Sequence, residues 1–139
     1  MHKRGKRVAV ISALMGIVGL LFGYLFEASP GICAGREALI IELEGGISAG
    51  SAAFLKRGLE EAQRRGASLV VVRLDTPGGF GSSMRTMVKG ILNSPVPVVV
   101  YVYPKGAGAA SAGVLITISA HVAAMAPGTN IGAAHPVSA

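Results

Sequence analysis

The sequence is poor in the residues from which disulfide frameworks and metal sites are built. Its 139 residues include one cysteine, Cys33, no tryptophan and 7 acidic side chains. A single cysteine excludes a disulfide framework and a thiolate metal site. No Asp or Glu follows Asp75, so a carboxylate metal site or a pair of catalytic carboxylates would depend on upstream acids that mostly occupy a helix surface. Both kinds of site are therefore disfavoured.

The net charge of +6 does not indicate a nucleic-acid-binding protein. Residues 1–34 hold four basic residues and one acid, whereas residues 35–139 hold nine basic and six acidic residues. Half of the positive excess thus lies at the N-terminus, where basic residues before an apolar segment mark the cytoplasmic side of a membrane. Aromatic residues make up only 5% of the chain, and no basic stripe accompanies them, so the usual pattern of a nucleic-acid surface is missing.

The N-terminus has the pattern of a membrane-targeting segment. The run from Val8 to Phe26 is apolar, uncharged and preceded by four basic residues. A membrane span needs about 20 such residues, so the run fits either a signal-peptide core or a membrane anchor. Ala34 offers a small residue for cleavage. We therefore expect residues 1–34 to be a signal peptide or anchor, and residues 35–139 to lie on the extracytoplasmic side of a membrane.

From Leu39 onwards, strand-like and helix-like segments alternate. The strand-like runs are short and largely apolar, and the run over 69–74 is β-branched and apolar on both faces, which is typical of a parallel sheet. The expected strands are 39–43, 69–74, 96–102 and 122–126; the expected helices run from 48 to a cap at Gly66, from a cap at Ser82 or Ser83 to 93, and over 109–119. This order predicts an α/β fold with right-handed crossovers. Since no helix follows the last strand, we expect a domain truncated at its C-terminus.

Two glycine-rich corners follow two of these strands. Ser111 lies in the stretch from Lys105 to Gly113, and Gly78 and Gly79 follow the strand over 69–74. The carboxyl ends of parallel strands share one edge of a sheet, where such folds bind ligands. A hydroxyl at a helix start and bare backbone N–H groups are the parts of a serine nucleophile and an oxyanion hole. Each corner also has a purely structural interpretation. A serine among small residues often serves only in packing, and a Pro-Gly-Gly turn often serves only to reverse the chain.

Other readings of the Ser111 stretch are weaker. Gly106-x-Gly108-x-x-Ser111 resembles a dinucleotide-binding fingerprint, but the acidic residue expected about 20 residues later is missing. The Gly-Lys-Ser/Thr of a phosphate-binding P-loop is also missing.

A catalytic serine also needs a base. His121 would lie ~15 Å from Ser111 along a helix at 1.5 Å per residue, which is too far. His135 could fold back towards the site, and an ordinary loop histidine is an equal interpretation.

Four motifs follow one another along the chain: Asp75-Thr-Pro-Gly-Gly79, Ser94-Pro-Val-Pro-Val98, Gly108-Ala-Ala-Ser-Ala-Gly113 and Ala126-Pro-Gly-Thr-Asn-Ile-Gly-Ala-Ala-His-Pro136. Together and in this order, they resemble the NfeD family of membrane-bound serine proteases within the ClpP/crotonase-like superfamily. The resemblance covers the chain from about Ala38 to its end. It implies a ClpP/crotonase-like fold of repeated β-α units behind an N-terminal signal or transmembrane helix.

The resemblance also implies a chemistry and partners. Ser111 would be the nucleophile of a Ser–Lys dyad, and the N–H groups of Gly78 or Gly79 and of Ala112 would form the oxyanion hole. Substrates would be apolar peptide segments, including those of stomatin-like membrane proteins, and the enzyme would form homo-oligomers without a cofactor.

One part of the family pattern is missing from this chain. The family's lysine lies beyond the position of Ala139, and no lysine follows Lys105. Clp-type relatives use a histidine as the base instead, and His135 stands close to that position. We therefore expect the 139-residue chain alone to be inactive as a protease. The alternative is a non-catalytic binding or scaffold module on the same fold.

Overall fold

The computed structural model describes residues 37–134. The apolar run from Val8 to Phe26, the small residue Ala34 and His135 therefore lie outside the described residues. Within residues 37–134, no helix combines the length and the apolar composition needed to cross a membrane.

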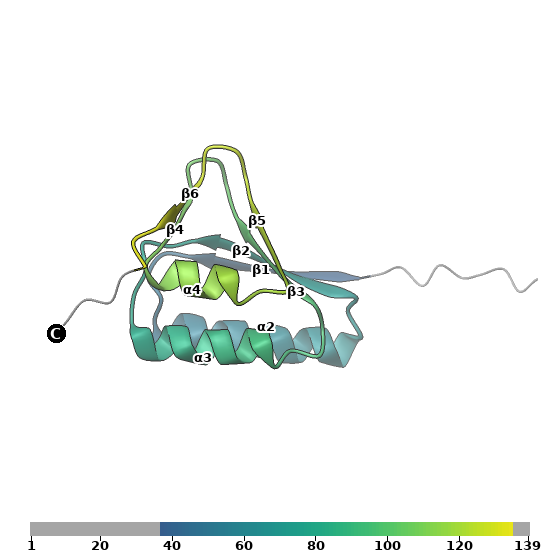
Figure 1. The fold of residues 1–139 in the computed structure, drawn as a ribbon. Helices are drawn as coiled ribbons and strands as arrows, with labels where there is room; N and C mark the ends of the chain where they lie inside the picture. Colours follow the sequence, from purple (N-terminus) through teal and green to yellow (C-terminus); the bar gives the residue numbers. More distant parts are fainter. Residues whose placement is uncertain (1–36, 135–139) are drawn as a thin grey trace, which may run out of the picture. The chain divides into compact units, whose positions relative to one another are not determined.

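A four-stranded parallel sheet forms the centre of the fold, in the order β1-β2-β3-β5 (Figure 1). Its strands are β1 (Ala38–Glu44), β2 (Leu69–Asp75), β3 (Val98–Val102) and β5 (Val122–Met125). Every strand pair is parallel, as the apolar runs predict. A second, two-stranded parallel sheet pairs β4 (Gly108–Ala110) with β6 (Asn130–Gly132).

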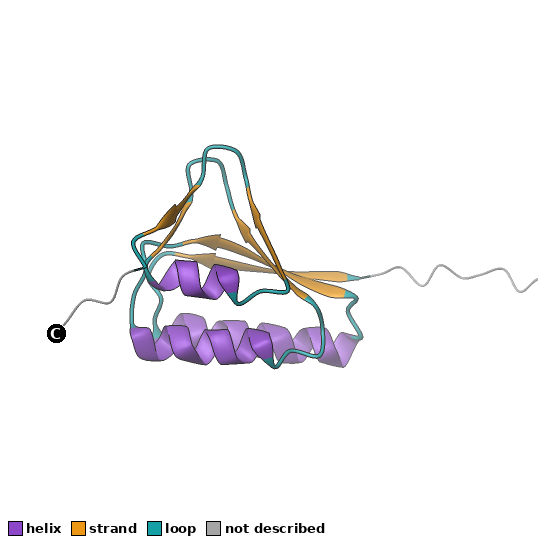
Figure 2. Cartoon of the chain, in the orientation of Figure 1, coloured by secondary structure: helices purple, strands orange, loops and turns teal. Residues whose placement is uncertain are grey.

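Three helices lie on one side of the main sheet (Figure 2). They are α2 (Ala49–Arg65), α3 (Gly81–Leu92) and α4 (Ala112–Ile118). The ends of α2 follow from local chemistry. Ser48 and Ser51 form a reciprocal capping box at its N-terminus, and Gly66 ends it in the left-handed conformation, where glycine has no Cβ penalty.

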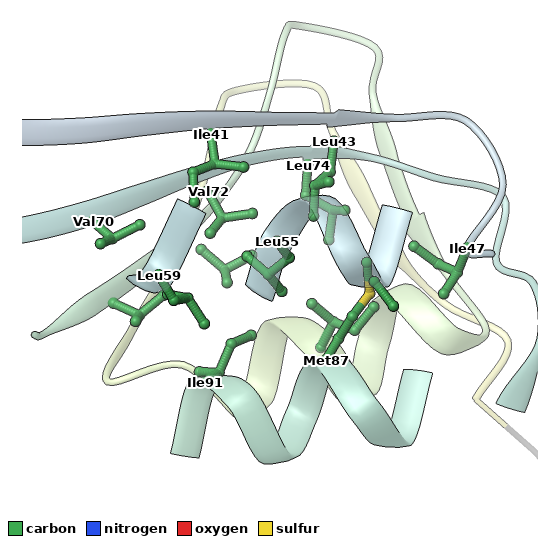
Figure 3. Close-up of a cluster of buried hydrophobic side chains, with 14 of the residues drawn as sticks. Ile41, Leu43, Ile47, Leu55, Leu59, Val70, Val72, Leu74, Met87 and Ile91 are labelled. Carbon is green, nitrogen blue, oxygen red and sulfur yellow. The ribbon is translucent and has the colours of Figure 1, made fainter. Parts of the chain in front are cut away.

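The core fills the space between this side of the sheet and the helices (Figure 3). Alternate strand residues such as Val72 and Leu74 point into it and are fully buried, as are Leu55 of α2 and Ile91 of α3. Removing such aliphatic side chains from water stabilises the fold by about 25 cal/mol per Å². The opposite side of the sheet is less covered, and Ile40 of β1 is 60% exposed there.

The structure corrects several predicted boundaries. The second helix begins at Gly81 with Phe80 at its N-cap, so neither Ser82 nor Ser83 is the cap. The predicted helix over 109–119 begins only at Ala112, because residues 108–110 form strand β4 instead. Strand β3 starts two residues later than predicted, at Val98. Strand β6 was not predicted at all, since its residues carry no apolar pattern.

The packing of α2 against β1 makes a testable prediction about two helix glycines. A Cβ added at Gly58 would overlap Cδ1 of Ile41, whereas one added at Gly90 would meet Leu59 Cδ1 at an ordinary 3.5 Å. Glycine inside a helix costs about 1 kcal/mol relative to alanine. Gly90→Ala should therefore raise the free energy of unfolding by about 0.5–1 kcal/mol, and Gly58→Ala should not.

Chemical denaturation of both variants measures the difference. Ile41→Ala removes both Cδ1 and Cγ1, the two atoms that the added Cβ would crowd, so Gly58→Ala should become stabilising in that background. Equal stabilisation by Gly58→Ala and Gly90→Ala in the unmodified chain would contradict this packing.

Candidate active site

The two glycine corners meet. A Cβ built on Gly78 would lie 2.8 Å from Ser111 Cβ and 3.3 Å from Ser111 Oγ. Any side chain at position 78 would therefore displace the serine, and glycine is required for this close approach. The juxtaposition arises because β2 ends at Asp75 and β4 runs beside that end. The sequence-based expectation that both corners share one edge is confirmed in the geometry.

Short backbone hydrogen bonds fix the distance between the corners. Thr76 donates its N–H to the Gly108 carbonyl at 2.7 Å, and its own carbonyl accepts from Ala110 N–H at 3.0 Å. The Asp75 carboxylate accepts a further bond, from Gly108 N–H, at 2.9 Å. On the other side of β4, Ser111 N–H donates to the Gly132 carbonyl at 2.9 Å. The chain that carries the serine is thus held from both sides.

Ser111 has a strained backbone. Its φ of 52° and ψ of −111° match the first central position of a type II′ turn, where glycine dominates. A non-glycine residue in such a region costs on the order of 1–3 kcal/mol and persists only where the surroundings impose it. The residue lies at the N-cap of α4, its side chain makes no capping bond, and it is exposed. Strain at an exposed serine on a sheet edge is typical of a functional site.

Two backbone donors beside the serine are without acceptors in the described part of the chain. The N–H groups of Gly79 and Ala112 have no hydrogen-bond acceptor within residues 37–134. The Gly78 N–H differs, because it donates to Thr76 Oγ1 at 3.0 Å. Of the three predicted oxyanion donors, Gly79 and Ala112 are thus available in this conformation, while Gly78 is engaged.

Gly79 is fixed by its neighbour Ile47. A Cβ at Gly79 would overlap the Ile47 carbonyl oxygen, and Phe80 N–H donates to that same oxygen at 2.9 Å. Gly79 therefore has to be glycine for a packing reason, and its φ of 154° adds a conformational one. The sequence motif signalled both glycines, but it did not indicate the part that Ile47 plays.

The described residues do not bring a base to Ser111. His121 Nδ1 accepts the N–H of Val98 at 3.1 Å, at the amino end of β3, whereas Ser111 belongs to the carboxyl edge. Lys105 is exposed on the loop before β4. Within residues 37–134, no cluster of His, Cys, Asp and Glu could hold a metal ion.

The strain at Ser111 can be measured. Ser111→Gly removes the Cβ that makes this conformation costly, whereas Ser111→Ala keeps it and removes only the hydroxyl. We expect the glycine variant to exceed the alanine variant in free energy of unfolding by about 1 kcal/mol. Denaturant titration of the two variants tests this. An alanine variant as stable as the glycine variant would mean that the backbone at position 111 is not strained.

Comparison with known proteins agrees with this geometry. Residues 37–139 match the family described as "NfeD1b, N-terminal domain". The chain is 41% identical over 113 residues to the membrane-bound protease PH1510 of Pyrococcus horikoshii, and 35% identical over 124 residues to the membrane protein NfeD1b of Bacillus subtilis. The matched regions cover 81% and 88% of this chain, but only 25% and 27% of those relatives.

Solved structures of a related protease also resemble this chain. A lysine-to-alanine variant of a membrane-bound stomatin-specific protease, in complex with a substrate peptide, superimposes with a TM-score of 0.73 at 39% identity over 75% of this chain. A serine-to-alanine variant of the same protease gives a TM-score of 0.72 at 38% identity over 73% of this chain. The match covers 48% and 49% of those two chains.

ClpP1 from Listeria monocytogenes shares only the fold, with a TM-score of 0.62 at 19% identity over 68% of this chain and 55% of its own. The meeting of the serine strand with the glycine corner and the match over residues 37–139 lead to one conclusion. The chain belongs to the NfeD family and has its ClpP-like α/β fold.

Proposed function

We propose that this chain carries the nucleophile and the oxyanion hole of a membrane-associated serine endopeptidase. The observation that supports this most directly is the contact between Gly78 and the strained, exposed Ser111. Beside it, the N–H groups of Gly79 and Ala112 are without acceptors in residues 37–134. A hydroxyl and two preorganised donors on one edge fit acyl transfer better than ligand binding alone.

The proposed reaction begins with attack of Ser111 Oγ on the carbonyl carbon of a peptide bond. The serine proton passes to a base, and the carbonyl oxygen becomes an oxyanion bound by the N–H groups of Gly79 and Ala112. The base then returns the proton to the leaving amine, the C–N bond breaks, and water hydrolyses the ester on Ser111. Gly78 lacks the Cβ that would displace Ser111, so the serine can lie this close to the glycine corner.

A lysine outside this chain is the proposed base. Solved relatives include one variant with a serine replaced by alanine and another with a lysine replaced by alanine, which fits a Ser–Lys dyad. A lysine acts as a base only when neutral, and burial lowers a lysine's pKa. The 139-residue chain alone would then lack its base, unless His135 takes that part.

The relatives support a proposal for the substrates, partners and location of this protein. One solved relative is described as stomatin-specific and holds a substrate peptide, and both curated relatives are described as membrane proteins. We therefore propose peptide segments of stomatin-like membrane proteins as substrates. From the family resemblance we further propose that these segments are apolar and that the enzyme is a homo-oligomer. Residues 1–34 would be the signal peptide or membrane anchor, and residues 35–139 would form the first part of the protease domain, on the extracytoplasmic side.

Labelling with a fluorophosphonate probe tests the proposed nucleophile. The full-length protein should become covalently labelled, and Ser111→Ala should remove both the label and peptide hydrolysis, with a loss in kcat of about 10³-fold or more. Mass spectrometry of the labelled peptide identifies the modified residue. Ser82→Ala, at an exposed serine of α3, is the matched control and should label normally.

The opposite result has a clear meaning. Absence of labelling in the full-length protein, together with partner binding unchanged by Ser111→Ala, would favour a non-catalytic scaffold on the same fold.

A further inference from the structure

Thr76 lies between the two halves of the site. It is only 1% exposed, and its backbone bonds both Gly108 and Ala110 on the serine strand. Its methyl group packs against α4, since a Cβ added at Gly113 would lie 2.6 Å from Thr76 Cγ2. None of these contacts needs the hydroxyl. Burying a hydroxyl costs free energy unless it is hydrogen-bonded, so the hydrogen bonds of the Thr76 hydroxyl indicate what it does in the structure.

The Thr76 hydroxyl bonds Gly78 at both of its backbone polar groups. Thr76 Oγ1 accepts from Gly78 N–H at 3.0 Å and donates to the Gly78 carbonyl at 3.3 Å. The same carbonyl also accepts from Ile47 N–H at 2.8 Å. Glycine otherwise offers little resistance to rotation of the peptide unit between residues 78 and 79. Thr76 and Ile47 together hold that unit in one orientation.

The fixed orientation of this peptide unit sets the direction of the Gly79 N–H. A trans peptide unit is planar, so its carbonyl and its N–H point to opposite sides. Because the Gly78 carbonyl points to Thr76 and Ile47, the Gly79 N–H points away from them. The Gly78 N–H is meanwhile occupied by the hydroxyl. The hydroxyl thus keeps one glycine donor occupied and leaves the other free.

We propose that Thr76 is a positioning residue for the oxyanion hole: its hydroxyl selects the Gly79 N–H, rather than that of Gly78, as the donor. This inference rests on the proposed peptidase function. An oxyanion donor is effective when its direction is fixed before the reaction. Losing the hydroxyl should therefore slow the covalent step at Ser111 more than it weakens binding of the probe or the substrate.

The test compares Thr76→Val, which keeps the shape, with Thr76→Ser, which keeps the hydroxyl, in the full-length protein. The rate constant of covalent labelling by the fluorophosphonate (kinact) and its binding constant (KI) are measured separately, well below the melting temperature of each variant. Thr76→Val should lower kinact about tenfold or more with little change in KI. Thr76→Ser should label at close to the wild-type rate.

Thr76→Ala covers the case in which the valine variant does not fold. The alanine and serine variants both lack the methyl and differ only in the hydroxyl, so alanine should label slowly and serine normally. Labelling of Thr76→Val or Thr76→Ala at Ser111 at the wild-type rate would overturn the inference and leave the proposed function standing. A serine variant as slow as the alanine variant would also overturn it. A wild-type protein not labelled at Ser111 would overturn both.

Discussion

The site depends on the hydrogen bonds that tie the end of β2 to β4. Thr76 exchanges two backbone bonds with the serine strand, and the Asp75 carboxylate holds Gly108. These bonds join residues more than thirty positions apart in sequence, and they set Ser111 against Gly78. Without them, the serine would be a hydroxyl on a loop. With them, the hydroxyl lies beside the backbone N–H groups that could stabilise an oxyanion.

The fold tolerates a strained edge because most of its large buried side chains lie between the main sheet and the helices α2 and α3. The backbone of Ser111 and the glycines at 78 and 79 adopt conformations that favour glycine or require it, and the close contacts there exclude side chains. At Ser111, which is not a glycine, this backbone conformation costs on the order of 1–3 kcal/mol. The main stabilising contacts join the fully buried valines of β2 and β3 to the apolar faces of α2 and α3. The candidate site lies beyond the end of β2 and at the end of β4, outside these contacts.

Local signals made the main architecture predictable from the sequence. Short apolar runs identified the four strands of the main sheet. Ser48 and Gly66 marked the ends of α2, because capping acts within a few residues. The nature of residues 108–110 was not predictable. Their small side chains fit a helix equally well. Pairing with β6, and bonds to Asp75 and Thr76, which are distant in sequence, hold them as a strand instead.

The candidate site was likewise predictable where local motifs mark it, and not where it depends on contacts between residues distant in sequence. Glycine and serine motifs pointed to Ser111, Gly78 and Gly79, and the family resemblance added Ala112. The structure places Gly78 against Ser111. Which N–H groups are free could not be predicted, because that depends on the Thr76 hydroxyl. A threonine two residues before a glycine is a known turn pattern, but its meaning for the donors emerges only in three dimensions.

The most direct test of the account is a crystal structure of the full-length protein after reaction with a fluorophosphonate. We expect the phosphorus to be bonded to Ser111 Oγ, with the phosphoryl oxygen about 2.7–3.1 Å from the backbone nitrogens of Gly79 and Ala112, and the Gly78 N–H still bonded to Thr76. A phosphoryl oxygen directed into solvent, or bound by Gly78 in place of Gly79, would contradict the proposed oxyanion hole.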